Sequence, residues 1–517
     1  MITDVTSTKR PVESRKCIVV MCADTRYHVV RTAAVSLGWH VEDGERDDVP
    51  SSFHGISLNK DMNSLSETIS LLGAKCNAAL NPQIIWLDKS VLSSRVAALS
   101  CFHRVNHFPG MHVIARKATL FKRLMRIRRQ HDLSPTLRRS LDAFPWSFSP
   151  STELLQLERF ISDGREGEIF ILKPNKGCEG KGIIITAEPL HVVERMTDEE
   201  RNECLVQQYV PHPLCIDRKK FDLRIYVLVT SVVVGKPPRK GFRGAAPPKE
   251  THGGSSFPLN GLQLFVHKEG LVRICTEDYA TPNASNCKRQ GMHLTNYAVN
   301  KRAQGFSVGD VLNTDDSSSN GICEGNKRDF KFLEHYINGL VGCKSDTTED
   351  DVSGGETTSR WERVLHRIDR CILLTVLSGL ENLRREFIGT GASRGSRSDG
   401  RNCFELLGVD ILLTEDLKPV LMEVNHSPSL FCDSDFDFRT KHRVLMDVFR
   451  LLEPYVPSLE NCNDAAYATL QESITAGGNM SSTGFRQISP LRVGGDDWAD
   501  EEMQMFEEML RHANGLR

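Results

Sequence analysis

The sequence predicts a mixed α/β (α+β) protein built from two or three domain-sized units. An alternation of strand and helix near the N-terminus, a strand-rich middle and long helical segments towards the C-terminus support this prediction. With 517 residues, of which 39% are hydrophobic, the chain has enough apolar material for more than one core.

The N-terminal part has the pattern of alternating strand and helix. Residues 17–22 (CIVVMC) and 83–88 (QIIWLD) are short apolar runs typical of buried strands, and residues 26–39 between them have the spacing of an amphipathic helix. Residues 1–15 show no such pattern, and we expect them to be disordered. Residues 116–130 follow as a basic helix.

The middle of the chain is rich in β-branched residues and predicts a sheet. The candidate strands are residues 168–174, 182–186, 204–210 and 221–234. Residues 235–260 then turn to Gly, Pro, Lys and Ser, which predicts a flexible insertion, and two further strands are expected at 262–266 and 271–275.

The C-terminal part is predominantly helical in pattern. Residues 342–359 are polar and predict a second, disordered insertion before a long helix at 361–383. A C-terminal extension (455–517) contains an acidic amphipathic helix at 496–512, with apolar residues at helical spacing: Trp498, Met505, Phe506, Met509 and Leu510. We favour docking of this helix on its own domain, with binding of a partner as the alternative.

Charge and cysteine content exclude several classes of function. Lys and Arg number 65 against 67 Asp and Glu, a net charge of -2, so no global basic field would attract nucleic acid or a membrane surface. No window approaches the roughly 20 apolar residues of a membrane helix, and the first residues lack a basic end followed by a long apolar stretch, so we expect a soluble protein that is not exported. The 15 cysteines lack a repeating CxxC spacing, which predicts reduced thiols.

Residues 408–430 (GVDILLTEDLKPVLMEVNHSPSL) predict a hairpin with acidic groups among apolar neighbours. A turn centred between positions 416 and 417 would set Asp410 directly opposite Glu423, with Cβ atoms roughly 4.5–5.5 Å apart, and Asn425 on the same face. Opposed carboxylates repel unless a cation lies between them, and carboxylate and amide oxygens suit Mg²⁺. The alternative is that one or both acids face solvent at a sheet edge.

A glycine-rich loop lies between two apolar strands at residues 171–185 (ILKPNKGCEGKGIII). Its glycines would let backbone amides approach phosphate oxygens, and Lys173 and Lys181 would supply positive charge. No Gly-Lys-Ser or Gly-Lys-Thr opens a helix here, so this is not a Walker loop. Considered alone, a plain flexible turn remains the alternative.

The strand at 221–234 begins with charges on one face. Lys220, Asp222 and Arg224 alternate with apolar residues, and after Arg224 the same face continues with Tyr226 and Leu228. A solvated face would stay polar, so charges confined to one end favour a site over a wet edge.

Six sequence blocks resemble, in the same order, the signature motifs of the tubulin tyrosine ligase-like family, and most closely its polyglutamylase branch. They are NHFPGM, ILKPNKGCEGKGI, VQQYV, KKFDLRIYVLVTS, HLTNYAVNK and FELLGVDILLTEDLKPVLMEVNHSPSL. The likeness runs over residues 16–454. It implies an ATP-grasp fold with an N-terminal lobe (16–115), a central lobe (116–230) and a C-terminal lobe (231–454), and ATP bound with Mg²⁺ between two sheet-bearing lobes.

The resemblance also implies roles for individual residues. Arg224, Arg273 and Lys173 are the implied catalytic residues. The implied nucleotide contacts are Lys117, Lys173, Glu179, Gly180, Lys181, Gly182, Gln207, Gln208, Tyr209, Val210, Lys220, Asp222, Thr295 and Asn296. Asp410, Glu423 and Asn425 would bind magnesium, and the incoming amino acid would meet Arg273, Tyr297, Lys327 and Lys441.

The implied activity is ATP- and Mg²⁺-dependent addition of glutamate to glutamate side chains of the acidic C-terminal tail of tubulin, through an acyl-phosphate. The implied partners are tubulin or microtubules and free L-glutamate, with no nucleic acid and no membrane, and the chain is expected to be monomeric. The expected location is the cytoplasm at the microtubule cytoskeleton, including the axoneme or basal body of a cilium or flagellum. The basic residues at 116–129 are a candidate docking surface for the tail, with a solvated helix face as the alternative.

Three other functions stay open from sequence. Glycine or tyrosine could be the added amino acid, the chain could be a non-catalytic microtubule-binding relative, or it could be an ATP-grasp ligase for a small molecule. The intact set of Asp410, Glu423 and Asn425, with Lys173 and Arg224, argues against a silent relative. The NHFPGM and LTNY blocks argue against a small-molecule ligase.

Overall fold

The structure is a computed structural model. It describes residues 18–43, 82–91, 93–99, 103–165, 167–175, 180–233, 261–303, 305–307, 325–340, 358–390, 402–453, 456, 483–489 and 498–515. The predicted disordered N-terminus (1–15), the insertion at 235–260, all but the end of the insertion at 342–359, and Glu179 lie outside these ranges.

The N-terminal region is a parallel sheet, and its first two strands are joined by a helix. Its strand order is β2-β1-β3-β4, and every neighbouring pair is parallel. The strands are β1 (Val19–Met21), β2 (His40–Glu42), β3 (Ile84–Ile85) and β4 (Arg104–Val105), with α1 (His28–Ser36) connecting the first two and α3 (Ser93–Ala97) lying before β4.

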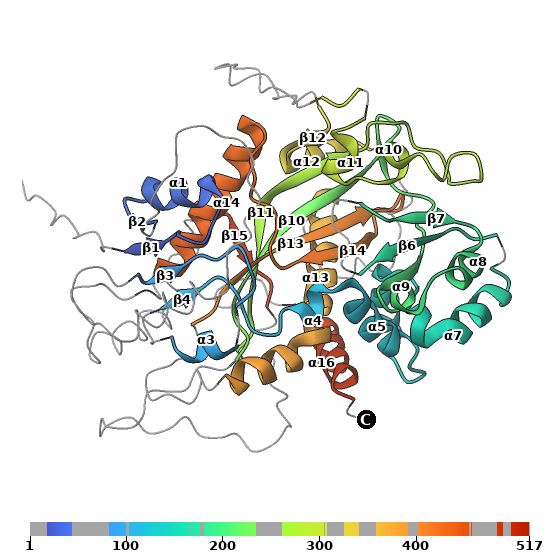
Figure 1. The fold of residues 1–517 in the computed structure, drawn as a ribbon, viewed down its shortest axis with the longest axis horizontal. Helices are drawn as coiled ribbons and strands as arrows, with labels where there is room; N and C mark the ends of the chain where they lie inside the picture. Colours follow the sequence, from blue (N-terminus) through green and yellow to red (C-terminus); the bar gives the residue numbers. More distant parts are fainter. Residues whose placement is uncertain are drawn as a thin grey trace, which may run out of the picture.

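A second, antiparallel sheet has the order β5-β8-β6-β7 and lies on the right of Figure 1. Its strands are β5 (Ser147–Phe148), β6 (Phe170–Pro174), β7 (Ile184–Thr186) and β8 (Cys204–Gln208). The helices of this region are α7 (Pro150–Ser162), α8 (Pro189–Glu194) and α9 (Asp198–Asn202). Phe148, Phe160 and Phe170 form its core, so this small sheet has a hydrophobic centre of its own.

The central sheet has the order β12-β11-β10-β13-β14, with β9 added beside β10 and β15 beside β11. The strands are β9 (Cys215–Ile216), β10 (Lys219–Ser231), β11 (Gln263–Ile274), β12 (Lys327–Arg328), β13 (Glu405–Leu413), β14 (Pro419–Asn425) and β15 (Phe485–Gln487). The prediction of two strands at 262–266 and 271–275 is wrong, because β11 runs through both. β15 was not predicted at all.

Gly270 explains how β11 continues across its polar middle. A Cβ at this position would lie 2.4 Å from the ring of Phe330 and 2.6 Å from the carbonyl oxygen of Arg224. Only glycine lets the strand stay so close to its neighbours. The pairing of β10 with β11 continues on both sides of a register shift that lies next to Gly270.

Helices cover both faces of the central sheet. On one face, Leu223 and Ile225 of β10 pack in a core with α5 (Lys117–Arg128) and α13 (Arg360–Gly389). On the other face, Tyr226 and Leu228 pack against α1 and α14 (Asp435–Leu452). α13 is longer than predicted and begins at the end of the supposed insertion, where Ser359 caps it by accepting a hydrogen bond from the backbone N–H of Glu362.

The remaining helices are short, apart from the C-terminal α16. They are α4 (His112–Ala115), α6 (Pro135–Ser140), η1 (Leu141–Ala143), α10 (Gln290–His293), α11 (Tyr297–Asn300) and α12 (Phe330–Asn338). No helix in the described ranges is both long and apolar enough to cross a membrane.

The acidic helix α16 (Asp500–Ala513) docks on its own protein, which confirms the favoured interpretation. It packs against α13, α6 and α5, below the central sheet in Figure 1. Met505, Phe506 and Met509 are buried there, and Glu502 forms an ion pair with Arg370 of α13 at 2.7 Å. The apolar stripe of this helix is therefore covered by its own chain.

Candidate functional site

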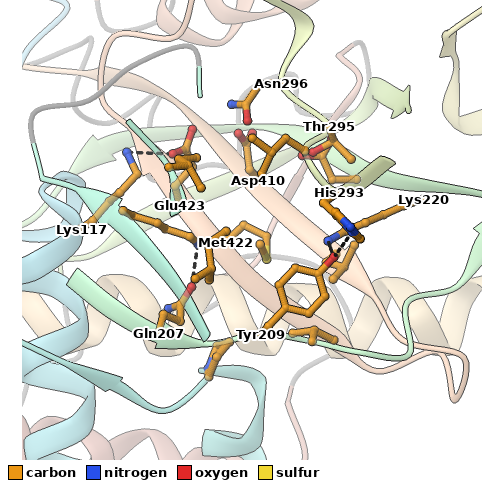
Figure 2. A pocket seen from close by; sticks show the side chains of 18 of the residues that line it. Lys117, Gln207, Tyr209, Lys220, His293, Thr295, Asn296, Asp410, Met422 and Glu423 are labelled. Carbon is orange, nitrogen blue, oxygen red and sulfur yellow. Dashed lines mark hydrogen bonds and ion pairs between the residues drawn. The ribbon is translucent and has the colours of Figure 1, made fainter. Parts of the chain in front are cut away.

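An open cleft lies between the small antiparallel sheet and the central sheet, and its empty space of about 720 Å³ includes open solvent. Figure 2 shows how side chains from both sheets converge on it. Thirteen of the predicted site residues line it: Lys117, Lys173, Gln207, Gln208, Tyr209, Val210, Lys220, Asp222, Arg273, Thr295, Asn296, Asp410 and Glu423.

The β13–β14 hairpin sets two carboxylates opposite each other, as predicted. Asp410 pairs with Glu423 in the ladder, and Gly408 pairs with Asn425. The turn differs from the prediction, because Leu413 pairs with Pro419. An irregularity at Met422 shifts the register by one residue and restores the expected pairing beyond it.

Asp410 belongs to a buried network of carboxylates and arginines. Arg224 donates two hydrogen bonds to Asp410, at 2.6 and 3.1 Å, and Arg273 lies 2.8 Å from the same carboxylate. Arg273 also bonds Asp222 through two nitrogens, and the Thr295 hydroxyl donates to Asp222 at 2.6 Å. The cross-strand pairs Asp222 with Arg273 and Arg224 with Asp410 create this network directly.

The network fixes the charge state of Asp410. Burial disfavours the ionised carboxylate, but Arg224 and Arg273 outweigh burial and hold the pKa of Asp410 below its usual range. The same carboxylates raise the pKa of Arg224 and Arg273 against the effect of burial. Asp410 and the two arginines therefore stay charged together, and Asp410 and Arg273 line the cleft.

Glu423 has its own cationic partner, Lys117, at 2.9 Å. The amide nitrogen of Asn425 donates to Glu423 at 3.1 Å. Protein cations compensate both carboxylates, so the opposition of Asp410 and Glu423 does not by itself require a metal ion. The oxygen donors of Asp410, Glu423 and Asn425 still gather on one hairpin, and their role as Mg²⁺ ligands stays a prediction.

Lys173 of β6 faces the cleft from the small sheet. Its ammonium group donates to the Gln207 side chain at 2.6 Å, and Gln207 in turn donates to Ser147 at 2.9 Å. Burial lowers the pKa of Lys173 to about 7, with the positive charges of Lys117 and Lys220 acting in the same direction. An anionic ligand in the cleft would favour its charged form.

A chain of polar side chains lies at the far end of the cleft. Lys220 donates to the Tyr209 hydroxyl at 3.0 Å, and this hydroxyl lies 3.2 Å from the ring nitrogen Nδ1 of His293 (Figure 2). Burial lowers the pKa of His293 to about 4, so its ring is neutral at physiological pH.

Sequence reasoning assigned no role to seven lining residues: Pro145, Ile171, Ile183, His293, Leu294, Leu412 and Met422. Most are apolar and suit the face of a flat aromatic group. The two-residue period of a strand could have found two of them, because Ile171 and Leu412 lie two positions from Lys173 and Asp410.

Three predicted amino-acid contacts gather beside the cleft rather than in it. Lys327 forms an ion pair with Asp437, and Lys441 lies 3.5 Å from the same carboxylate. The ring of Tyr297 lies 3.8 Å from the Lys327 ammonium nitrogen. Asp437, which sequence reasoning gave no role, is the shared partner of both lysines.

The described end of the glycine-rich loop approaches the nucleotide-side residues. A Cβ on Gly180 would lie 3.3 Å from the side-chain oxygen of Asn296, and Gly180 and Gly182 both have positive φ. Lys181 is exposed. None of these three residues lines the cleft.

The basic helix uses most of its charge within the chain. Three arginines of α5 and Arg129, which follows it, contact the protein itself: Arg123 donates to Asn382, Arg126 to the Ala513 carbonyl, Arg128 to Asp142, and Arg129 to Glu153. A structural role of this helix is therefore favoured over a docking surface for an acidic tail.

Residues 95–234, 257–328 and 341–462, more than half of the chain, match the model of the tubulin-tyrosine ligase family. Mouse tubulin polyglutamylase TTLL6 is 31% identical over 386 residues, which are 74% of this chain and 37% of the relative. Human tubulin polyglutamylase TTLL7 is 27% identical over 82% of this chain and 40% of the relative. A probable beta-tubulin polyglutamylase of Tetrahymena thermophila is 27% identical over 83% of this chain and 30% of its own length. The matched part of the chain thus spans between 30% and 40% of these relatives.

Proposed function

Because this chain belongs to the tubulin-tyrosine ligase family, we propose that it is an ATP- and Mg²⁺-dependent ligase that adds glutamate to glutamate side chains of the acidic C-terminal tail of tubulin. The relatives named as tubulin polyglutamylases support glutamate as the added amino acid. The proposed partners are microtubules and free L-glutamate, and the proposed location is the microtubule cytoskeleton, including the cilium or flagellum.

We propose that the fold is of the ATP-grasp type, with ATP between the small antiparallel sheet and the central sheet. The position of the cleft between these two sheets supports this assignment. The apolar residues Ile171, Ile183 and Leu412 would contact the adenine ring, and Lys117 and Lys173 would bind phosphates. The described part of the glycine-rich loop lies next to Asn296 and would approach the phosphates from there.

The donor set of the hairpin fits Mg²⁺. Asp410, Glu423 and Asn425 offer hard oxygen atoms on neighbouring positions, and Mg²⁺ is commonly held by one or two carboxylates with substrate phosphates completing its shell. When bound, the ion would neutralise charge on the phosphate oxygens. Lys117 would then move its contact from Glu423 to a phosphate.

The observation that carries the proposal is the buried network of Asp222, Arg273, Asp410 and Arg224. An oxygen of the acceptor carboxylate attacks the γ-phosphorus of ATP, the bond to ADP breaks, and an acyl-phosphate forms. The amine of glutamate attacks the acyl carbon, the bond to phosphate breaks, and an amide forms with loss of a proton to solvent. Both steps develop negative charge on oxygen, and fixed guanidinium groups stabilise such charge without reorganisation.

The amino acid itself is proposed to bind beside this network, near Lys327 and Lys441. Two lysines close together suit a substrate that carries a carboxylate on its side chain, which glycine and tyrosine lack.

The test is incorporation of radiolabelled glutamate, with glycine and tyrosine in parallel, into purified microtubules with Mg²⁺-ATP. We expect labelling by glutamate alone, and loss of it in Glu423→Gln with the fold retained in circular dichroism. Labelling by glycine or tyrosine would keep the ligase and reject glutamate. Full activity of Glu423→Gln would reject the metal assignment, and no labelling at all would favour a non-catalytic relative.

A further inference from the structure

We infer that Asp437 is a positioning residue that holds Lys327 and Lys441 as a two-pronged clamp for a carboxylate of the amino-acid substrate. The inference rests on the proposed function and deepens it, because it names the residue that makes the amino-acid site selective for an acidic side chain. We call Lys327, Asp437 and Lys441 the lysine clamp.

Asp437 reaches this position from the first turn of α14. The hydroxyl of Ser434 accepts a hydrogen bond from the backbone N–H of Asp437, which fixes the start of the helix. The Asp437 side chain is 1% exposed. Lys441 follows one helical turn later, and Lys327 comes from β12, where it pairs with Arg273 of β11. The clamp therefore lies beside the arginine network.

Each lysine of the clamp is held from two sides. Lys327 contacts one oxygen of Asp437 and the ring of Tyr297, and Lys441 contacts the other oxygen of Asp437 and the carbonyl oxygen of Phe431. An ammonium group has three N–H donors. Among the contacts that the structure describes, each lysine thus keeps at least one donor for a ligand, and Asp437 helps to determine where the ammonium group lies.

The charges of the clamp do not balance. Two lysines share one carboxylate, and their side chains are only 12% and 7% exposed. Burial lowers the pKa of Lys441, and Asp437 acts against that effect by favouring the charged form. The positive charge that remains, in a site shielded from water, favours an anionic ligand.

The neighbouring arginines are less suited than the two lysines to bind the carboxylate of the substrate. Arg224 and Arg273 are already bonded to Asp410 and Asp222, so their charges are balanced by the protein. Lys441 is close enough to Arg224 for their charges to interact. A carboxylate held by the clamp would therefore lie next to the reacting groups without displacing the arginine network.

A purely structural role for Asp437 is the competing explanation. Asp437 would then only neutralise buried lysines, and its loss would lower stability and every activity alike. A positioning role predicts a separate loss of affinity for glutamate, because the two lysines would repel each other and turn away from the substrate.

The experiment is calorimetric titration of the full chain with L-glutamate in the presence of Mg²⁺ and a non-hydrolysable ATP analogue. We expect Asp437→Asn to weaken glutamate binding at least about 10-fold while the affinity for the ATP analogue changes less than about 2-fold. Asp435→Asn, an exposed acid in the same helical turn, is the matched control and should bind glutamate like the wild type. Asp437→Glu keeps the negative charge, so it should retain part of the affinity for glutamate. This variant keeps the inference testable if Asp437→Asn does not fold.

A double-mutant cycle separates the two explanations. In a Lys441→Gln background, Asp437→Asn should weaken glutamate binding much less than it does in the wild type, because both changes act on one clamp. Unchanged glutamate affinity in Asp437→Asn, or equal losses for glutamate and for the ATP analogue, would overturn the inference. Wild-type protein that binds the analogue but no glutamate would instead reject the proposed amino acid, and the inference with it.

Discussion

Two charge clusters lie side by side in this protein, and they are built differently. The arginine network joins Arg224 and Arg273 to Asp222 and Asp410 through paired hydrogen bonds across three strands. The lysine clamp holds two ammonium groups on a single carboxylate, at the junction of a short strand and a helix. The first is balanced in charge, and the second is not.

In the proposed mechanism, this difference would distinguish a rigid catalytic network from an adaptable binding site. A guanidinium group is planar and bonds a carboxylate through two nitrogens, so its position is set by geometry. An ammonium group is a point charge on a flexible stem, so its position depends on the partner that holds it. We expect changes in the network to affect turnover and stability, and changes in the clamp to affect affinity for the amino acid.

The largest effect is expected for Asp410→Asn. This change leaves two buried guanidinium groups with one carboxylate between them, and breaking a buried ion pair costs about 3–5 kcal/mol. Turnover should fall below detection, and urea unfolding should show the loss of stability. Asp198→Asn, in an exposed pair with Arg201, should change the free energy of unfolding by less than about 0.5 kcal/mol. Wild-type turnover in Asp410→Asn would contradict the role of the network.

Lysine and arginine exchanges sharpen the comparison directly. Arg224→Lys keeps the charge but loses the paired hydrogen bonds to Asp410, and we expect kcat to fall on the order of 100-fold. Lys327→Arg should instead raise KM for glutamate, with kcat changed less than about 3-fold. Steady-state kinetics with glutamate and ATP varied separately would measure both. Equal effects of Arg224→Lys and Lys327→Arg on kcat would contradict the distinction between the arginine network and the lysine clamp.

A smaller effect is expected for Gly408→Ala, beside Arg224. The added Cβ would lie 2.8 Å from Pro428 and 3.0 Å from the Arg224 side chain, so we expect the contact of Arg224 with Asp410 to be disturbed. We expect a loss of about 1–3 kcal/mol in stability together with reduced kcat. Gly389→Ala, at the end of α13 with open space around it, is the control and should be neutral or slightly stabilising. Normal kcat in Gly408→Ala would show that the position of Arg224 tolerates displacement.

The smallest effect concerns the protonation of Lys173. With a pKa of about 7, its amine is mostly neutral at pH 8, and anionic phosphates nearby would raise that pKa. Nucleotide binding at pH 8 should therefore take up as much as about one proton per molecule. Titration calorimetry in buffers of different ionisation enthalpy measures this uptake, and Lys173→Met should abolish it. Uptake that persists in Lys173→Met would assign the proton to another group.

Much of the site could be predicted because strand periodicity carries over long distances. Lys220, Asp222 and Arg224 share one face of β10, and the apolar residues that follow on that face enter the core, as the sequence indicated. The opposition of Asp410 and Glu423 was also predicted, although the turn was misplaced by half a residue. The irregularity at Met422 compensates for that shift, and no sequence pattern predicts this irregularity.

Other features depend on contacts between distant segments and were therefore hidden. β15 joins β11 across more than two hundred residues of sequence, and its three residues are too few to show a period. The role of Asp437 depends on Lys327 coming beside it from another strand. The cationic partners of Asp410 and Glu423 could not be derived from the hairpin alone, because Arg224, Arg273 and Lys117 come from other elements.

The most direct test of the central claim follows an oxygen atom. An acidic peptide with the sequence of a tubulin tail, carrying ¹⁸O in its glutamate side-chain carboxylates, is incubated with the protein, Mg²⁺-ATP and L-glutamate, and the released phosphate is analysed by mass spectrometry. Transfer of one ¹⁸O to phosphate for each glutamate added is the predicted result, because the acceptor carboxylate attacks ATP and loses that oxygen. Phosphate without ¹⁸O, released while glutamate is added to the peptide, would contradict the acyl-phosphate mechanism.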